Sequence, residues 1–152
     1  HPERLAAFVA LGQRLHQLSD DELTSLAARA RNQNPWFDRP NVTAALQGVA
    51  ALLAEEPLRH WAAHYPPEPE TPRQVGVVMA GNIPLVGFHD LLCVLLSGHH
   101  LLAKLSQDDT VLMRWVADEL LRLEPRFAGR LQFVERLNAA DAFIATGSDN
   151  TA

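Results

Sequence analysis

Three short polar stretches hold the residues of this sequence that could do chemistry, and each follows an apolar run. The first contains Asn82, the second contains Lys104 and Ser106, and the third contains Gly147 and Ser148. An asparagine side-chain amide can donate to an oxygen that becomes negative during a reaction. A lysine ammonium can contact the ribose or phosphate of a nucleotide, and backbone amides at a helix start favour a phosphate. Together these residue types indicate a site that binds a nucleotide and stabilises a developing negative charge.

Three of these residues also have ordinary structural interpretations. Asn82 could cap the N-terminus of a helix that has Pro84 in its first turn. Lys104 could simply extend from a strand end into solvent. Ser106 could form a capping box with Asp109, three residues later. The capping and oxyanion roles of Asn82 use different atoms, so the two can coexist.

An alternation of strand and helix patterns must position the three polar stretches. Short apolar runs rich in β-branched residues predict strands, and longer apolar or amphipathic runs predict helices. The predicted strands cover 75–80, 101–106, 131–134 and 142–146, and the predicted helices cover 83–97 and 106–123. Strands that read as continuous apolar runs are typical of a parallel sheet with helices on both faces. We therefore expect an α/β fold containing a partial Rossmann-like parallel sheet of about four strands.

The carboxyl ends of parallel strands meet at one edge of a sheet, where open α/β sheets bind their ligands. The three polar stretches are therefore expected to lie side by side. The connection between the last two strands is short, because only residues 135–141 separate them. A parallel crossover normally takes a dozen or more residues, so either a shortened crossover to a neighbouring strand or an antiparallel pairing fits.

A helical arm precedes the predicted sheet. Ser19 and Glu22 have the spacing of a capping box, which predicts a helix starting at Asp20. A further helix is expected after Pro40, and four prolines within 66–72 predict an extended linker. We divide the chain into a helical N-terminal arm, 1–67, and a partial nucleotide-binding α/β domain, 68–152.

Composition argues against several classes of protein. The formal net charge is −5 and the 13 Lys and Arg residues are scattered, so we expect no nucleic-acid partner. No apolar run reaches the roughly 18 residues of a membrane span, and no secretory signal opens the sequence, so we expect a cytoplasmic protein. Cys93 is the only cysteine, which excludes an internal disulfide. His99 and His100 are adjacent and make a poor metal pair, so no metal site is expected.

The ends of the sequence suggest a piece of a longer protein. The first residue is His1 rather than Met, and the last residues, 147–152, stop where a helix would begin. A truncated sheet would expose its edge, so self-association is expected. Trp36, Trp61 and Trp115 are interpreted as packing anchors, because no basic groove accompanies them.

The motifs Ala-Gly-Asn-Ile-Pro at 80–84, Ala-Lys-Leu-Ser at 103–106 and Thr-Gly-Ser at 146–148 resemble those of the LuxC-type acyl-CoA reductase family. This family belongs to the aldehyde dehydrogenase superfamily, and the resemblance covers nearly the whole chain. It implies an aldehyde dehydrogenase-like fold. It also implies that Asn82 is a catalytic residue that helps hold the acyl carbonyl oxygen.

The same resemblance implies the cofactor-binding residues. Lys104 would contact the adenosine ribose, Gly147 and Ser148 would lie by the pyrophosphate and nicotinamide, and Ser106 is assigned to the same group. Many superfamily members that use NAD place a glutamate three residues after this lysine to bind the ribose hydroxyls. Here that residue is Gln107. A neutral residue does not repel a 2′-phosphate, so NADPH is the expected cofactor.

The reaction implied by the resemblance is the reduction of a fatty acyl-CoA thioester to an aldehyde. A cysteine attacks the thioester, CoA leaves, and hydride from the nicotinamide reduces the acyl-enzyme. In the family this cysteine belongs to a later domain, after the Thr-Gly-Ser stretch. Cys93 lies among leucines and valines, where a thiol is most often a buried hydrophobe with a raised pKa. We therefore expect the 152-residue chain alone to be inactive.

Two other functions remain open from the sequence. The chain could be a non-catalytic interaction or assembly module that binds no nucleotide. It could also belong to another aldehyde dehydrogenase superfamily member that acts on an acyl phosphate or an aldehyde.

Overall fold

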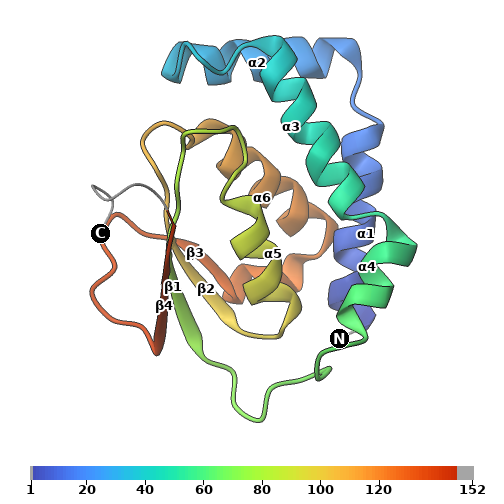
Figure 1. Ribbon diagram of the computed structural model, residues 1–152, viewed down its shortest axis with the longest axis vertical. Helices are drawn as coiled ribbons and strands as arrows, with labels where there is room; N and C mark the ends of the chain where they lie inside the picture. Colours follow the sequence, from blue (N-terminus) through green and yellow to red (C-terminus); the bar gives the residue numbers. More distant parts are fainter. Residues whose placement is uncertain (1, 147–152) are drawn as a thin grey trace.

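The computed structural model describes residues 2–146, which form a helical arm followed by an α/β unit (Figure 1). The elements, in chain order, are α1 Pro2–His16, α2 Asp20–Gln33, α3 Arg39–Leu52, α4 Glu55–Ala62, β1 Gln74–Val78, α5 Phe88–Leu96, β2 His100–Lys104, α6 Val111–Leu123, the 3₁₀ helix η1 Pro125–Gly129, β3 Leu131–Phe133 and β4 Ala142–Ala145. Within this range, no helix combines the length and the apolar character that crossing a bilayer requires.

The four strands form one parallel sheet in the order β3-β2-β1-β4. This confirms the predicted α/β fold with a Rossmann-like sheet. Neither prediction for the last two strands was right, because β3 and β4 are not neighbours: β3 pairs with β2, and β4 pairs with β1. Residues 134–141 cross from one edge of the sheet to the other in an irregular, extended course.

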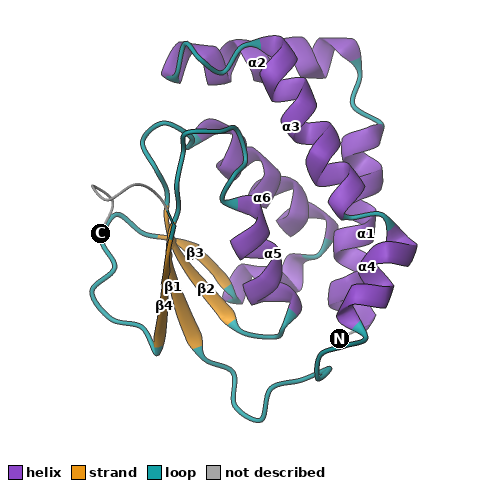
Figure 2. Cartoon of the chain, viewed as in Figure 1, coloured by secondary structure: helices purple, strands orange, loops and turns teal. Residues whose placement is uncertain are grey.

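Helices α5 and α6 pack on the same face of the sheet. The connections β1–α5–β2 and β2–α6–β3 step in the same direction across the sheet, so right-handed crossovers put both helices on one side. Val77, Leu101 and Ala103 face these helices and are almost fully buried. Figure 2 shows α5 and α6 on this side of the sheet, with α1, α3 and α4 beyond them, whereas we expected helices on both faces. On the opposite face the ring of Phe143 lies over Gly76 and is 59% exposed.

The arm packs on α5 and α6 and forms a third layer over the sheet (Figure 1). Phe8 of α1 lies at the centre of this contact, since its ring centroid is 6.4 Å from that of Phe88 and 5.7 Å from that of Phe127. All three rings are at most 1% exposed. The arm and the sheet therefore bury their apolar residues in one continuous core.

The helix starts and the linker predicted for the arm are present in the structure. Ser19 Oγ accepts from the Glu22 amide, and the Glu22 carboxylate accepts from the Ser19 amide, which confirms the capping box. The helix expected after Pro40 is α3, and Asp38 caps it by accepting from the Asn41 amide at 3.0 Å. The proline-rich linker lies in the irregular segment between α4 and β1.

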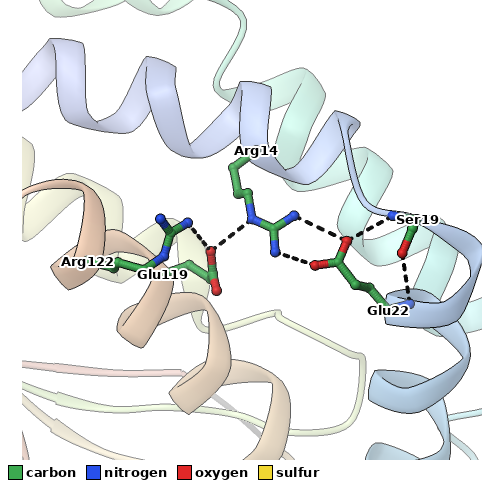
Figure 3. Close-up of polar contacts among 5 residues, drawn as sticks. All are labelled: Arg14, Ser19, Glu22, Glu119 and Arg122. Carbon is green, nitrogen blue, oxygen red and sulfur yellow. Dashed lines mark hydrogen bonds and ion pairs between the residues drawn. The ribbon is translucent and has the colours of Figure 1, made fainter.

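An ion-pair network holds the arm to α6 (Figure 3). Arg14 of α1 reaches Glu22 of α2 on one side and Glu119 of α6 on the other, the latter through an Nε–Oε2 distance of 3.0 Å. Arg122 pairs with the same Glu119 oxygen at 2.8 Å. The hydrogen bond from Arg14 lowers the pKa of Glu22 to about 2. The network therefore links the consecutive helices α1 and α2 to α6, which is distant from them in sequence.

Candidate active site

The carboxyl ends of three strands lie side by side. The Met79 amide, just after β1, donates to the Lys104 carbonyl at 3.0 Å, and the Thr146 amide, just after β4, donates to the Val78 carbonyl at 3.3 Å. Strand β1 lies between β2 and β4, so the chain order reverses at β1. Such a reversal is where open α/β sheets form a crevice for a ligand. The structure thus brings the stretches of Asn82 and Lys104 to one edge, together with the start of the Thr-Gly-Ser stretch.

Gly147 and Ser148 lie outside the described residues. Their preceding residue, Thr146, is at the carboxyl end of β4, which fixes where the third polar stretch leaves the sheet. The roles assigned to these two residues stay predictions.

Asn82 lies in a turn between β1 and α5. Helix α5 begins at Phe88 with Gly87 at its N-cap, six residues after Asn82, so the helix-capping interpretation of Asn82 was wrong. The Asn82 side chain is exposed, and it has no hydrogen-bond partner among residues 2–146. Its side-chain amide is therefore available to an incoming group.

The turn that carries Asn82 packs directly on the loop after β2. Gly81 is buried, and a Cβ atom added there would lie 2.5 Å from Ser106 Cβ and even closer to Ser106 Oγ. Only glycine permits this approach. Ser106 Oγ accepts from the Asp108 amide at 3.2 Å, so the serine also shapes its own loop.

Asp109 makes a second connection between the same two loops. Its Oδ2 accepts from the backbone amide of Leu85 at 2.7 Å, and Leu85 has the left-handed φ of 61°. Asp109 is 2% exposed, and burial raises the pKa of its carboxyl group to about 6. The expected capping box between Ser106 and Asp109 was wrong, because the Asp109 carboxylate points to the turn of Asn82 and α6 begins only at Val111.

Lys104 ends β2 and is exposed at the carboxyl edge of the sheet. It is the only lysine of the sequence. Within residues 2–146 its ammonium forms no hydrogen bond and no ion pair, so its charge is available for a ligand. Gln107, three residues later, is also exposed. A neutral side chain therefore lies close in sequence to a free cation at this edge.

A profile of the acyl-CoA reductase (LuxC) family matches residues 15–152, which include all three polar stretches. This chain belongs to the acyl-CoA reductase (LuxC) family. A search of curated proteins and a search of solved structures each gave no match. Membership of the LuxC family implies a fatty acyl-CoA reductase, which is an oxidoreductase with an acyl-CoA thioester as substrate.

Cys93, the only cysteine of the 152-residue sequence, is remote from the carboxyl edge. Cys93 lies on α5 and lines a cavity of about 330 Å³ together with Trp61, Tyr65 and His99. His99 directly precedes β2, so this cavity is at the amino edge of the sheet. Burial, and to a lesser extent the charge of Asp90, raises the pKa of the Cys93 thiol. The raised pKa confirms the sequence-based expectation for this thiol and favours its unreactive, protonated form.

Two residues of the LuxC arm reach the candidate site, and the sequence reasoning missed them. Gln33 Oε1 accepts from the amides of Thr110 and Val111 at 3.2 and 3.3 Å, so it caps α6 from another helix. Asn34 Nδ2 donates to the Asp108 carbonyl at 3.4 Å. No local pattern could reveal these contacts, because more than 70 residues separate the partners.

Two of the three tryptophans interpreted as packing anchors do pack against the core. Trp36 is 84% exposed, so its interpretation as a packing anchor was wrong, whereas Trp61 and Trp115 pack against the core. In the part of the chain that the structure describes, no three His, Cys, Asp or Glu side chains are grouped to hold a metal ion.

Proposed function

We propose that this chain is the N-terminal nucleotide-binding part of an NADPH-dependent reductase, which converts a fatty acyl-CoA thioester to an aldehyde through a cysteine acyl-enzyme. One observation carries the proposal: Asn82 and Lys104, both exposed and without partners in the described chain, follow adjacent parallel strands at the sheet edge where nucleotides bind. Family membership supplies the substrate class.

The chemistry of the donors at this edge fits a phosphorylated dinucleotide. Lys104 offers an unpaired positive charge, and Gln107 adds no negative charge that would repel a 2′-phosphate. Ser106 can still donate its hydroxyl hydrogen, because in its hydrogen bond with the Asp108 amide the serine oxygen is the acceptor. We assign Lys104 and Ser106, with Gly147 and Ser148, to coenzyme binding. When bound, the coenzyme supplies the hydride for reduction of the acyl group.

Asn82 is assigned to the acyl carbonyl oxygen. This oxygen gains negative charge when a nucleophile attacks the carbonyl carbon, and a fixed donor stabilises that charge. The Asn82 side-chain amide has two such hydrogens and no competing acceptor among residues 2–146. Removal of one oxyanion donor in other enzymes lowers kcat about 10²- to 10³-fold, which is the loss expected for Asn82→Ala in the catalytically competent protein.

Coenzyme binding by this chain can be tested through its only lysine. Labelling with ¹³C-lysine gives one Lys104 side-chain signal, which we expect to shift and saturate as NADPH is added. Lys104→Ala should weaken NADPH binding about 10-fold, as expected for loss of a hydrogen bond to a charged group. Arg59→Ala is the matched control, because Arg59 is an exposed cation on α4 that pairs, among residues 2–146, only with Glu55 four residues earlier.

Two results would contradict the coenzyme role of this chain. One is an unchanged Lys104 signal at saturating NADPH, and the other is equal NADPH affinity in the wild type and Lys104→Ala. Self-association in sedimentation experiments without any NADPH binding would instead favour an assembly module. The exposed ring of Phe143, on the face of the sheet opposite α5 and α6, would be the first contact to examine in that case.

A further inference from the structure

Asp109 is the only polar or charged side chain that is buried in the part of the chain the structure describes. One of its carboxylate oxygens, Oδ2, accepts from the Leu85 amide at 2.7 Å. The other oxygen, Oδ1, has no hydrogen-bond partner among these residues. Burial of a carboxylate with an unpaired oxygen is costly, and the backbone amides of Leu112 and Met113 in the first turn of α6 offset only part of that cost.

The hydrogen bond of Asp109 holds a strained residue. Leu85 has a φ of 61°, which is unfavourable for a side chain with a Cβ atom, and its side chain is 4% exposed. The Leu85 carbonyl accepts from the Phe88 amide at 3.0 Å, at the first residue of α5. Leu85 is thus fixed by its amide, its carbonyl and its side chain. Strain of this kind persists only where the surroundings hold it, and it is commonest at functional sites.

The fixed residue ends the turn that carries Asn82. At the start of that turn, Gly81 packs against Ser106, and at its end Leu85 is bound by Asp109. Both contacts come from the same loop, the one that follows β2 and Lys104. Asn82 therefore lies exposed between two fixed points, although its own side chain has no partner in the described chain.

We propose that Asp109 is a positioning residue, which fixes the Asn82 turn through the Leu85 amide and so holds the Asn82 side-chain amide ready for an oxyanion before the acyl group binds. This inference rests on the proposed function for the role of Asn82. The holding of the turn can be measured without substrate or coenzyme, so its failure and failure of the proposed function are distinguishable.

The electrostatic surroundings of Asp109 make its protonation measurable. Burial raises the pKa of Asp109 to about 6, and interactions with the backbone amides of Leu85, Leu112 and Met113 oppose this rise. No charged side chain of the described chain contributes to the shift. The elements packed on Asp109 therefore present amides and apolar groups to it, and protonation of this one carboxyl should be visible at Leu85.

The experiment is NMR of the full 152-residue chain without coenzyme, over pH 5 to 8. In the wild type, the Leu85 amide and the Asn82 side-chain amide should titrate with a midpoint near 6, the pKa of Asp109. Asp109→Asn should abolish this titration but keep an acceptor for Leu85. Asp109→Ala removes the acceptor, so exchange of the Leu85 amide should be about 10-fold faster or more, and the Asn82 side chain should become more mobile.

Asp108→Ala is the matched control. Asp108 is the exposed neighbour of Asp109, and its structural contacts use its backbone and its Cβ atom, both of which alanine keeps. This variant should leave the Leu85 and Asn82 signals as in the wild type. If Asp109→Ala does not fold, the wild-type titration and Asp109→Asn decide the question.

The proposal is overturned if the Leu85 amide shows no titration near pH 6 in the wild type. It is also overturned if Leu85 responds while the Asn82 side-chain amide stays unchanged in every variant, because Asp109 would then be only structural. A retained Asn82 response with no NADPH binding would reject the proposed function alone.

Discussion

Replacement of Asp109 by asparagine should stabilise the folded chain at neutral pH. The two side chains have nearly the same shape, and asparagine keeps an oxygen that can accept from the Leu85 amide. The change removes a negative charge that is 2% exposed and has one oxygen without a partner in the described chain. The stability of the wild type should therefore depend on the protonation of Asp109, whereas that of Asp109→Asn should not.

The pKa of Asp109 gives the size of this effect. Burial raises the pKa from the ordinary 3.8 to about 6 in the folded state. The difference of about 2 pH units, at about 1.36 kcal/mol each, corresponds to about 3 kcal/mol in the free energy of unfolding. Because the folded state binds the proton more tightly, this stability is present below pH 3.8 and is lost as the pH rises to about 6.

The assay is urea unfolding of the wild type and Asp109→Asn at several values between pH 4 and pH 8. The difference between their free energies of unfolding should change by about 3 kcal/mol over this range, in favour of the variant at high pH. Thermal midpoints should diverge by about 6–12 °C for a chain of this length. Asp108→Asn, the same change at the exposed neighbouring residue, should follow the wild type at every pH.

Other acids titrate in part of this range but do not confuse the comparison. Arginine partners lower the pKa of Glu22 and of Glu124 to about 2, so the stability that these groups give falls as the pH drops below about 4.5. Both variants and the wild type keep these ion pairs, so the loss cancels in the difference. If the wild type and Asp109→Asn have parallel pH profiles, the buried carboxylate is not perturbed and the reasoning fails.

Three further predictions concern the contacts around the site. Gly81→Ala places a Cβ atom against Ser106 and should lower the free energy of unfolding in urea by about 1–3 kcal/mol. The double variant Gly81→Ala with Ser106→Gly should regain most of this stability, and equal losses in the single and the double variant would show that the two loops do not touch. Gln33→Ala removes the cap of α6 and should cost about 1 kcal/mol with faster amide exchange at Thr110; unchanged exchange would contradict this. Gln107→Glu should weaken NADPH binding about 10-fold but leave NADH binding nearly unchanged, as measured by calorimetry; equal effects on both would argue against a 2′-phosphate near this residue.

The parts of the fold that depend on local signals could be predicted from the sequence. The capping box of Ser19 and Glu22 is satisfied within four residues, and apolar runs fix the strands because burial decides their structure. The order of the strands depends on the course of residues 134–141, which cross the sheet without a helix. Neither length nor composition specifies such a crossing, so the neighbours of β3 and β4 were predicted wrongly.

The candidate site was predicted in position but not in its supporting contacts. The residues after each strand come to one edge because parallel strands require it, so Asn82 and Lys104 lie at adjacent strand ends as expected. The capping role expected for Ser106 failed because a tertiary partner caps α6, and that expected for Asn82 failed because α5 starts later, at Phe88, without a side-chain cap. Gln33 from the arm caps α6, and α5 starts only after the strained turn at Leu85.

Because residues of the arm cap α6 and contact the loop before it, the arm supports the candidate site directly. Arg14 holds the arm to α6 through Glu119, and Gln33 then binds the first amides of the same helix. The loop that ends in this cap is the loop from which Ser106 and Asp109 fix the Asn82 turn. Residues that are far apart in the sequence thus form one chain of contacts from the arm to the proposed oxyanion donor.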